Sequence, residues 1–449
     1  MAARVYLSLA LFAAMPALAQ VGANNTGAAN GAQMQVPAPV SNEAYPTEVG
    51  SEVRSNYLHT GLVISTAYND NVLAGTGSRP ISDNSYSIWP TIALDQTTSR
   101  LHQTLTYRPG FTFYQRTRTL NEVDQNLALD FQYRLSPHVT ASLQDSFRKS
   151  SNVFNQPYSL SGGAISGSAQ STLVPVVAPF ADQLTNTANT ELTYQFSRNG
   201  MIGASGIFTN LDYPNPSEVP GLYNSISRGG MAFYSHRLSQ TQYVGATYQY
   251  LQIQGSSPGA QNNTQNEAGS ETQTHTVFLF YSLYLTSNLS FSLSGGPQYL
   301  DLSQSPFSAL RSWAPAATAS IGWRGRRTNF AASYSHLVSG GGGLLGAFSS
   351  NSANALARWQ LARTWTIGSA ANYALTKNVS SFMVQSNPGG HIVSETFTVQ
   401  HPISEHLNME LGYMRLHQSY SSIEVVANAP DSNREYISVS YQFTRPLGR

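Results

Sequence analysis

Short segments in which apolar and polar residues alternate recur along most of this chain. In residues 127–135 every second position is apolar, and Asp130, Gln132 and Arg134 lie between those positions. The same period of two runs through residues 277–285, 289–295 and 407–413. A period of two is typical of a β-strand with one apolar and one polar face. The segments are about ten residues long, which is the length that a tilted membrane-spanning strand requires.

The connections between these segments are alternately short and long. The short ones are polar and predict hairpin turns; they lie at 97–100, 136–138, 198–200, 239–241, 286–288, 324–327, 362–364 and 404–406. The long ones are rich in Gly, Ser and Asn and lie at about 69–83, 117–124, 149–187, 214–227, 255–272, 301–311, 339–350, 377–390 and 418–433. Eight turns and nine loops join about 18 strands, and this regular order predicts an all-β fold: a transmembrane antiparallel up-and-down β-barrel with short periplasmic turns and long external loops.

Composition agrees with a barrel and argues against an ordinary soluble domain. Only 10% of the 449 residues are charged, against about 25% in typical soluble domains. Apolar residues nevertheless reach only 41%, and no apolar run after the N-terminus approaches the length of a transmembrane helix. A soluble all-β sandwich or propeller is the alternative, but its strands would be shorter and its turns more uniform.

The chain divides into four predicted parts. Residues 1–19 have the Arg4 charge, the apolar stretch and the Ala17-Leu18-Ala19 cleavage pattern of a secretory signal peptide; the alternative is a single anchoring helix, for which the apolar stretch is short. Residues 20–59 lack periodicity and predict a disordered periplasmic lead. Residues 60–443 form the predicted barrel, and residues 444–449 form a C-terminal tail.

Some strands are less regular than others. Pro90, Pro109 and Pro315 fall within predicted strands, where a proline removes a ladder donor and marks a bulge or a weaker strand. Residues 231–238 can be phased either way, with no clear apolar face. Trp323, Trp359 and Trp365 lie beside predicted turns, where an aromatic girdle at a membrane interface belongs.

The lumen is predicted to carry the charges of the barrel. A charge that faces lipid at mid-depth costs about 2–4 kcal/mol, so inward placement is expected. By phase with the clear strands, the inward-facing set is Asp95, His102, Arg108, Arg116, Asp130, Arg134, Arg148, Glu191, Arg358, Glu410 and Glu435. Arg108, Arg116, Asp130, Arg134, Arg148, Arg358 and Glu410 are the pore-lining candidates. This lining either filters solutes by charge or is a paired network that only holds the wall.

No pattern in the sequence predicts catalysis. The chain has no cysteine, which excludes disulfides and thiolate metal sites. It contains no Walker A, GxSxG or HExxH motif, and no His pair has metal-ligand spacing with a carboxylate nearby. We therefore expect a protein that is not an enzyme and needs no cofactor and no metal. The net charge of +1 gives no argument for binding to nucleic acid.

The third long connection, residues 149–187, is the longest and contains an apolar stretch at 173–180. External loops normally face water, so an apolar stretch within one is unusual. The loop is similar in position to the third loop of porins, which folds inward and narrows the channel. The alternative is a loop that contacts lipid or a partner.

The last predicted strand, residues 434–443, places Ile437, Val439, Tyr441 and Phe443 on one face. This strand resembles the C-terminal signal of outer-membrane barrel proteins, and Tyr441 and Phe443 are the predicted assembly signal. The whole region 60–443 resembles the outer-membrane β-barrel porin families of Gram-negative bacteria. The closing residues 440–449, Ser-Tyr-Gln-Phe-Thr-Arg-Pro-Leu-Gly-Arg, are similar to the tail of acidobacterial barrels.

The resemblance implies an outer-membrane location and a channel for passive diffusion of small polar solutes or saccharides. The alternative that it also implies is a non-conducting barrel that serves as a structural or assembly partner in exopolysaccharide secretion. The partners implied are outer-membrane lipid and lipopolysaccharide, the barrel-assembly machinery and, for the alternative, a polysaccharide.

Overall fold

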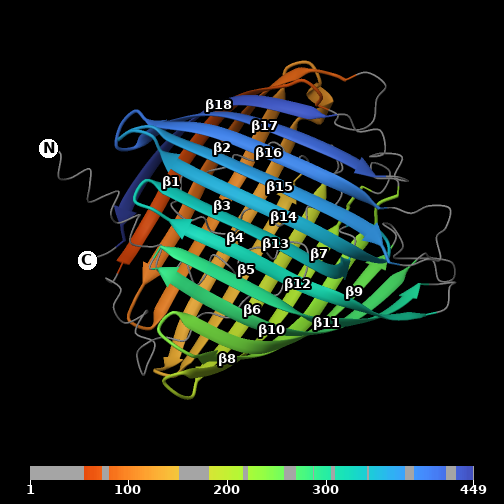
Figure 1. The fold of residues 1–449 in the computed structure, drawn as a ribbon. Helices are drawn as coiled ribbons and strands as arrows, with labels where there is room; N and C mark the ends of the chain where they lie inside the picture. The colour runs from red at the N-terminus through yellow and green to blue at the C-terminus, as the bar shows by residue number, and fades with distance from the viewer. Residues whose placement is uncertain are drawn as a thin grey trace.

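Eighteen antiparallel strands close into one barrel (Figure 1). The computed structural model describes residues 55–72, 80–150, 182–215, 221–256, 269–286, 288–304, 309–340, 343–379, 389–420 and 431–447. Each strand pairs with its neighbours in the chain, and β1 also pairs with β18, which closes the sheet. The predicted architecture and its strand number are therefore confirmed.

The strands are longer than a membrane requires and lie oblique to the axis of the barrel (Figure 1). Their bounds are β1 Ser55–Asn69, β2 Asp83–Thr97, β3 Leu101–Tyr114, β4 Glu122–Ser136, β5 Val139–Ser150, β6 Gln183–Gln195, β7 Gly200–Asp212, β8 Asn224–Arg237, β9 Gln242–Ser256, β10 Ser270–Thr286, β11 Leu289–Gln304, β12 Leu310–Arg324, β13 Thr328–Gly340, β14 Ala347–Gln360, β15 Thr366–Asn378, β16 Gly390–Pro402, β17 Leu407–Tyr420 and β18 Ser432–Pro446. One short 3-10 turn, η1 Arg118–Leu120, lies between β3 and β4.

The barrel includes more of the chain than the sequence predicted. Strand β1 begins at Ser55, within the predicted lead, and β18 continues to Pro446, within the predicted tail. Tyr57 lies opposite Pro446, so the pairing that closes the barrel uses residues from both of these segments. The N-terminal lead before Ser55 lies outside the described residues.

Prolines locally disturb the ladder between β2 and β3. The register runs from Ser85 to Ile88, is interrupted beside Pro90 and Pro109, and resumes at Ile92. Proline has no backbone N–H to donate, so this interruption has the cause that the sequence indicated.

The two faces of each strand differ in surroundings. Large apolar side chains on the outer face are exposed, for example Ile64, Ile92, Leu279 and Leu293, whereas alternate residues point into the barrel. The buried interior of this protein is therefore the inside of the barrel.

Candidate functional site in the barrel lumen

An apolar belt surrounds the barrel. Trp323, Trp359 and Trp365 lie on the outer face near the short turns and are 40–50% exposed, as the sequence predicted, and other exposed aromatic side chains, such as Tyr68, Tyr86 and Phe113, lie toward the opposite end of the strands. A closed barrel with an apolar exterior and aromatic girdles is the transmembrane architecture of bacterial outer membranes. The protein is therefore located in the cell outer membrane. Among the described residues, no helix is long and apolar enough to cross a membrane.

One sector of the inner surface is charged. We call the inner face of β2–β6 the charged wall; it carries Asp95, His102, Arg108, Asp130, Arg134, Arg148 and Glu191. Strict alternation places these residues inward, because their strand neighbours Ile92, Leu105, Leu127, Leu135 and Leu192 are exposed on the outer face.

Two arginines of the charged wall lie at the same level. In the register, Arg108 of β3 is opposite Asn126 of β4, and Asn126 is opposite Arg148 of β5. Neighbouring strands are about 4.8 Å apart, so the two arginine positions are separated by about two strand spacings. Asp130 lies on the same wall, where it accepts a hydrogen bond from Gln144.

Arg108 is held against an aromatic ring. Its guanidinium carbon lies 5.8 Å from the centre of the Trp89 ring, a distance that allows a cation–π interaction. The Trp89 side chain is completely buried and lies over Gly110, where an added Cβ would come within 2.3 Å of the ring. The sequence therefore uses glycine at position 110 to make room for the tryptophan that supports Arg108.

The remaining pore-lining candidates are dispersed. Arg116 lies beyond the end of β3 with an exposed side chain, and its backbone N–H donates to the Asp83 carboxylate at 3.1 Å. Arg134 faces inward near the short turn after β4, and Arg358 faces inward on β14. Glu410 is buried on β17 and accepts hydrogen bonds of 2.7 Å from Gln400 and from the Tyr436 hydroxyl. The structure thus groups Arg108, Asp130, Arg134 and Arg148 on one wall and leaves the other three apart. Their roles in conduction stay a prediction.

The inward placement predicted for Glu435 is wrong. Glu435 has the same phase as Ile437 and Val439, which are exposed on the outer face, and its own side chain is exposed there. It lies opposite Tyr413 and Tyr68 near the end of the barrel away from the short turns. A carboxylate at that level can reach water, so the lipid argument for inward placement does not apply to it.

The sequence also missed an outward carboxylate. Asp145 alternates with the apolar Leu143 and Phe147 on β5, and its partners in the register are Leu129 and Ala188. The strand phase therefore puts it on the outer face. The apolar residues Leu143 and Phe147 indicated an outward position for Asp145, whereas its own charge indicated an inward one.

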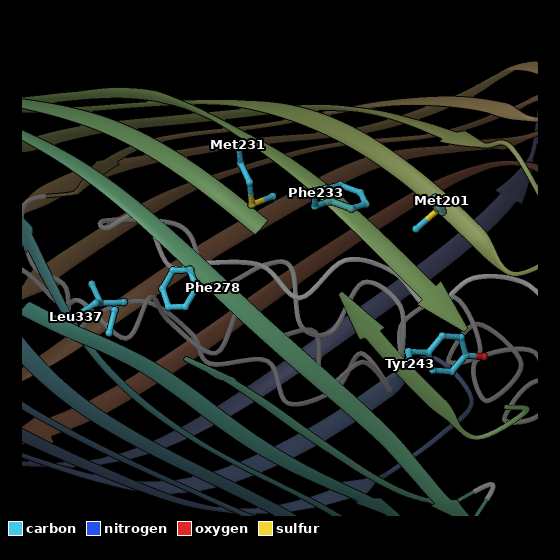
Figure 2. Packing of buried hydrophobic residues seen from close by; sticks show 7 residues of the cluster. Met201, Met231, Phe233, Tyr243, Phe278 and Leu337 are labelled. Atoms are coloured by element: carbon cyan, nitrogen blue, oxygen red, sulfur yellow. The ribbon is translucent and has the colours of Figure 1, made fainter. Parts of the chain in front are cut away.

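A second sector of the inner surface contains a buried apolar cluster. We call the inner face of β7–β13 the apolar wall; its buried cluster comprises Met201, Met231, Phe233, Tyr243, Phe278, Ala316 and Leu337. Figure 2 shows these side chains on the inner side of the strands. Phe278 is only 1% exposed. The same inner faces also carry buried polar side chains, among them Ser205, Thr247 and Thr274.

The end of the β13–β14 hairpin folds into the barrel. Its tip residues Leu344 and Leu345 are buried, and the carbonyl of Gly343 accepts a 2.7 Å hydrogen bond from the N–H of Tyr223. The N–H of Gly346 donates to Ser270 Oγ at 3.2 Å. Since Ser270 begins β10, the tip reaches across the inner side of several strands.

Glycine is required at the tip for two reasons. Gly343 and Gly346 have φ angles of 100° and 109°, which residues with a side chain rarely adopt. A Cβ on Gly343 would also come within 2.7 Å of the Tyr213 hydroxyl oxygen. The sequence analysis placed this Gly-rich segment in a long loop, and its inward path was missed. The apolar stretch of the third loop, for which inward folding was predicted, lies outside the described residues.

The predicted assembly residues are on the outer face. Tyr441 is 47% exposed and Phe443 is 44% exposed, close to the end of the barrel where the short turns lie. Both rings lie near the His406 ring of such a turn, with centroids 6.1 and 6.5 Å apart. Their part in assembly stays a prediction.

The described residues contain no group of three or more His, Asp or Glu side chains that could hold a metal ion. The polar side chains of the charged wall are spread over five strands. Their arrangement can filter charge along a passage.

Comparisons with known proteins return structural neighbours only. No family model and no curated protein sequence matches the chain. Among solved structures, the chain is similar to OccAB4 of Acinetobacter baumannii, with 7% identity, a TM-score of 0.42 and coverage of 88% of this chain and 100% of that one. It is also similar to the ferric citrate transporter FecA in its unliganded form, with 11% identity, a TM-score of 0.45 and coverage of 94% and 74%. OpdQ of Pseudomonas aeruginosa matches at 9% identity, with a TM-score of 0.42 and coverage of 88% and 100%. Similarity this low shows the fold alone.

Proposed function

We propose that the protein is an outer-membrane channel through which small polar solutes or saccharides diffuse passively. The observation that carries this proposal is the exposure of inward-facing residues on the charged wall. Ala128, Asp130 and Ser146 all point into the barrel, yet their side chains are exposed. Water therefore reaches the inside of the barrel along β4 and β5, and a solute that is hydrated can follow the same path.

The wall beside this path suits polar solutes. Arginine and carboxylate side chains offer donors and acceptors that replace the hydration of a small solute. In a confined passage such charges act on ions more strongly than exposed charges do, because they are less screened by water and salt. The mechanism is passive: the solute moves down its gradient, and the charged wall sets which solutes pass.

Single-channel recording in planar lipid bilayers tests the proposal. Purified protein should give discrete conductance steps in symmetrical salt, and liposomes that contain it should swell in isotonic solutions of small sugars. Correctly folded protein, verified by its faster migration on gels before heating than after, that gave neither signal would contradict the proposal.

A non-conducting barrel is the second candidate, and the inward-folded tip of the β13–β14 hairpin favours it. If that tip and other segments close the lumen, the protein would act as a structural or assembly partner. The process that we suggest for it is exopolysaccharide secretion, and this suggestion comes from the sequence resemblance alone. Replacing both Leu344 and Leu345 with Ser should loosen the tip. Conductance that appears only in this double variant would favour the closed barrel, whereas conductance in the unmodified protein would exclude it.

A further inference from the structure

Strand β12 has a free edge over its outer half. It pairs with β11 from Leu310 to Trp323, but its pairing with β13 begins only at Ala317. Residues 310–316 therefore have no β13 partner in the described part of the chain. Pro315 lies within this stretch, and proline is tolerated in sheets mainly at such edges.

Strand β13 leaves the barrel wall where its pairing with β12 stops. By strand phase Val338 belongs to the outer face, as do Tyr334 and His336, yet Val338 is only 2% exposed. It is buried in a cluster with the inward-facing Leu300 and Leu302 of β11. An outward position of β13 therefore packs on inward positions of β11, so the end of β13 has passed behind β12.

Gln298 holds the end of β13 in this position. Its side-chain amide donates to the carbonyl oxygen of Val338 at 2.9 Å, and its side-chain oxygen accepts the N–H of Val338 at 2.8 Å. Gln298 is 4% exposed and points inward from β11. These two bonds replace, for one residue, the ladder bonds that β12 would have supplied.

The wall between β12 and β13 is thus closed here by packing. Leu310 and Ala314 of β12 contact the cluster that contains Val338 and Ala347. Ladder hydrogen bonds are directional and need a matching backbone, whereas apolar packing is non-directional. An apolar chain of similar width can therefore replace these packing contacts. No apolar molecule can replace the hydrogen bonds of a complete ladder. We call this overlap the β12–β13 seam.

The seam separates two apolar regions. On the outer side lie Trp313, which is 68% exposed, and Pro315. Arg311, the next outward position toward the end of the strand, is paired with Asp301 at 2.9 Å. On the inner side lie Ala316, Leu337 and Phe278 of the apolar wall, of which Leu337 and Phe278 are seen close together in Figure 2. Ala316 lies three positions after Trp313, which is about 10 Å along the strand. The seam therefore extends from the aromatic girdle into the outer half of the membrane.

We propose that the β12–β13 seam is a lateral portal that admits a single acyl chain of a membrane amphiphile from the outer leaflet to the apolar wall. The neighbourhood identifies the occupant, because acyl chains are what surrounds Trp313 and Pro315 in the membrane. The portal is a function separate from the passive diffusion of polar solutes. Polar solutes would use the charged wall and would not need an apolar surface.

The probe for this portal is a phosphatidylcholine with a photoreactive diazirine near the end of one acyl chain. The protein is reconstituted in vesicles of this lipid and irradiated, and the labelled residues are mapped by mass spectrometry. Because the probe is a bilayer lipid, it samples the interior of the barrel only where the wall opens. We expect label on the outward Leu293 and also on the lumen-facing Ala316 and Leu337, with little on Met201, which lies on β7, five strands along the sheet from β12.

Two matched variants test whether the seam is the route. Gln298→Ala removes both bonds to Val338 and should raise the labelling of Ala316 and Leu337 several-fold. Gln249→Ala changes another inward glutamine, which is 5% exposed on β9, and should leave the labelling unchanged. Label confined to outward residues in both the unmodified protein and Gln298→Ala would overturn the portal. So would label on Met201 equal to that on Leu337, or labelling that Gln298→Ala does not change. None of these results bears on conductance, so the proposed channel function is tested separately.

Discussion

The charged wall and the apolar wall belong to one continuous sheet, but they meet different surroundings inside the barrel. On the charged wall, Asp130 and Ser146 point inward and are exposed. On the apolar wall, Phe278 points inward and is 1% exposed. The difference shows that the two sides of the lumen are packed differently: inward side chains of β4 and β5 are exposed, whereas the cluster on β7–β13 is buried.

The packing on the apolar side has an identifiable source. The β13–β14 hairpin folds inward and covers the inner faces of β10 and β11 with Leu337, Val338 and Ala347. Polar residues on those faces that are covered in this way, such as Gln298, find partners on the hairpin backbone. The hairpin therefore accounts for the packing on the inner faces of β10 and β11.

The largest expected difference between the two walls is in stability. Phe278→Ala would leave a cavity in the packed cluster and should lower the free energy of unfolding by about 3–5 kcal/mol. Asp130→Ala, on the exposed part of the charged wall, should change it by no more than about 0.5 kcal/mol. Urea unfolding in lipid vesicles measures both values. Equal effects would show that the two walls are packed alike.

A smaller loss of stability is expected where the charged wall contains its own packed contact. Gly110→Ala would push a Cβ into the buried Trp89 ring and should cost about 1–3 kcal/mol. The control is Gly295→Ala, since a Cβ there has only ordinary contacts, the nearest at 3.6 Å. The same unfolding measurement applies. If Gly110→Ala were as stable as the control, Trp89 would not be fixed above Gly110.

Ion selectivity should respond differently to charge reversal at Arg108, which lies within the charged wall, and at Arg116, which lies beyond it. Arg108→Glu reverses a charge that faces the lumen from the middle of β3 and should shift selectivity toward cations. Arg116→Glu reverses a charge that is exposed beyond the strand, where water and salt screen it, and should shift selectivity little. Reversal potentials across a salt gradient measure both shifts. Equal shifts would mean that depth in the barrel does not decide the influence of a charge.

The smallest effect is expected outside both walls, at Asp431. Its carboxylate accepts a hydrogen bond from Arg415 and lies beside His417, and the first of these contacts contributes most to holding the Asp431 pKa below its ordinary value of 3.8. A lowered pKa gives stability that is fully present above pH 3.8 and is lost as the pH falls through the folded-state pKa. The side chain is 37% exposed, so solvent weakens the effect.

The variant Asp431→Asn isolates this contribution. The difference in unfolding free energy between the unmodified protein and the variant should be constant at neutral pH and should disappear below the folded-state pKa. A difference that grew as the pH fell would have the wrong sign. Conductance should be the same in both proteins, because Asp431 belongs to neither wall.

The sequence by itself determined the architecture. Period-two segments can bury only one face, and alternately short and long connections bring their ends together in antiparallel order. The strand number, the short turns and the outward phase of Ile437, Val439, Tyr441 and Phe443 follow from this local pattern. The interruption beside Pro90 and Pro109 follows as well, because a missing backbone donor is a property of the residue itself.

Only the tertiary structure decided what fills the lumen. Residues 231–238 could not be phased because both of their faces carry large apolar side chains: Tyr234 points to the lipid, and Met231 and Phe233 point into the barrel as part of the apolar wall. Pro315 indicated an irregular strand, but nothing near it in the sequence shows that β13 passes behind β12. Nor does it show that Val338 of β13 bonds to Gln298, which is forty residues earlier in the chain. Alternation reports which face of a strand is apolar. What that face touches inside a closed barrel depends on a hairpin that arrives from elsewhere in the chain.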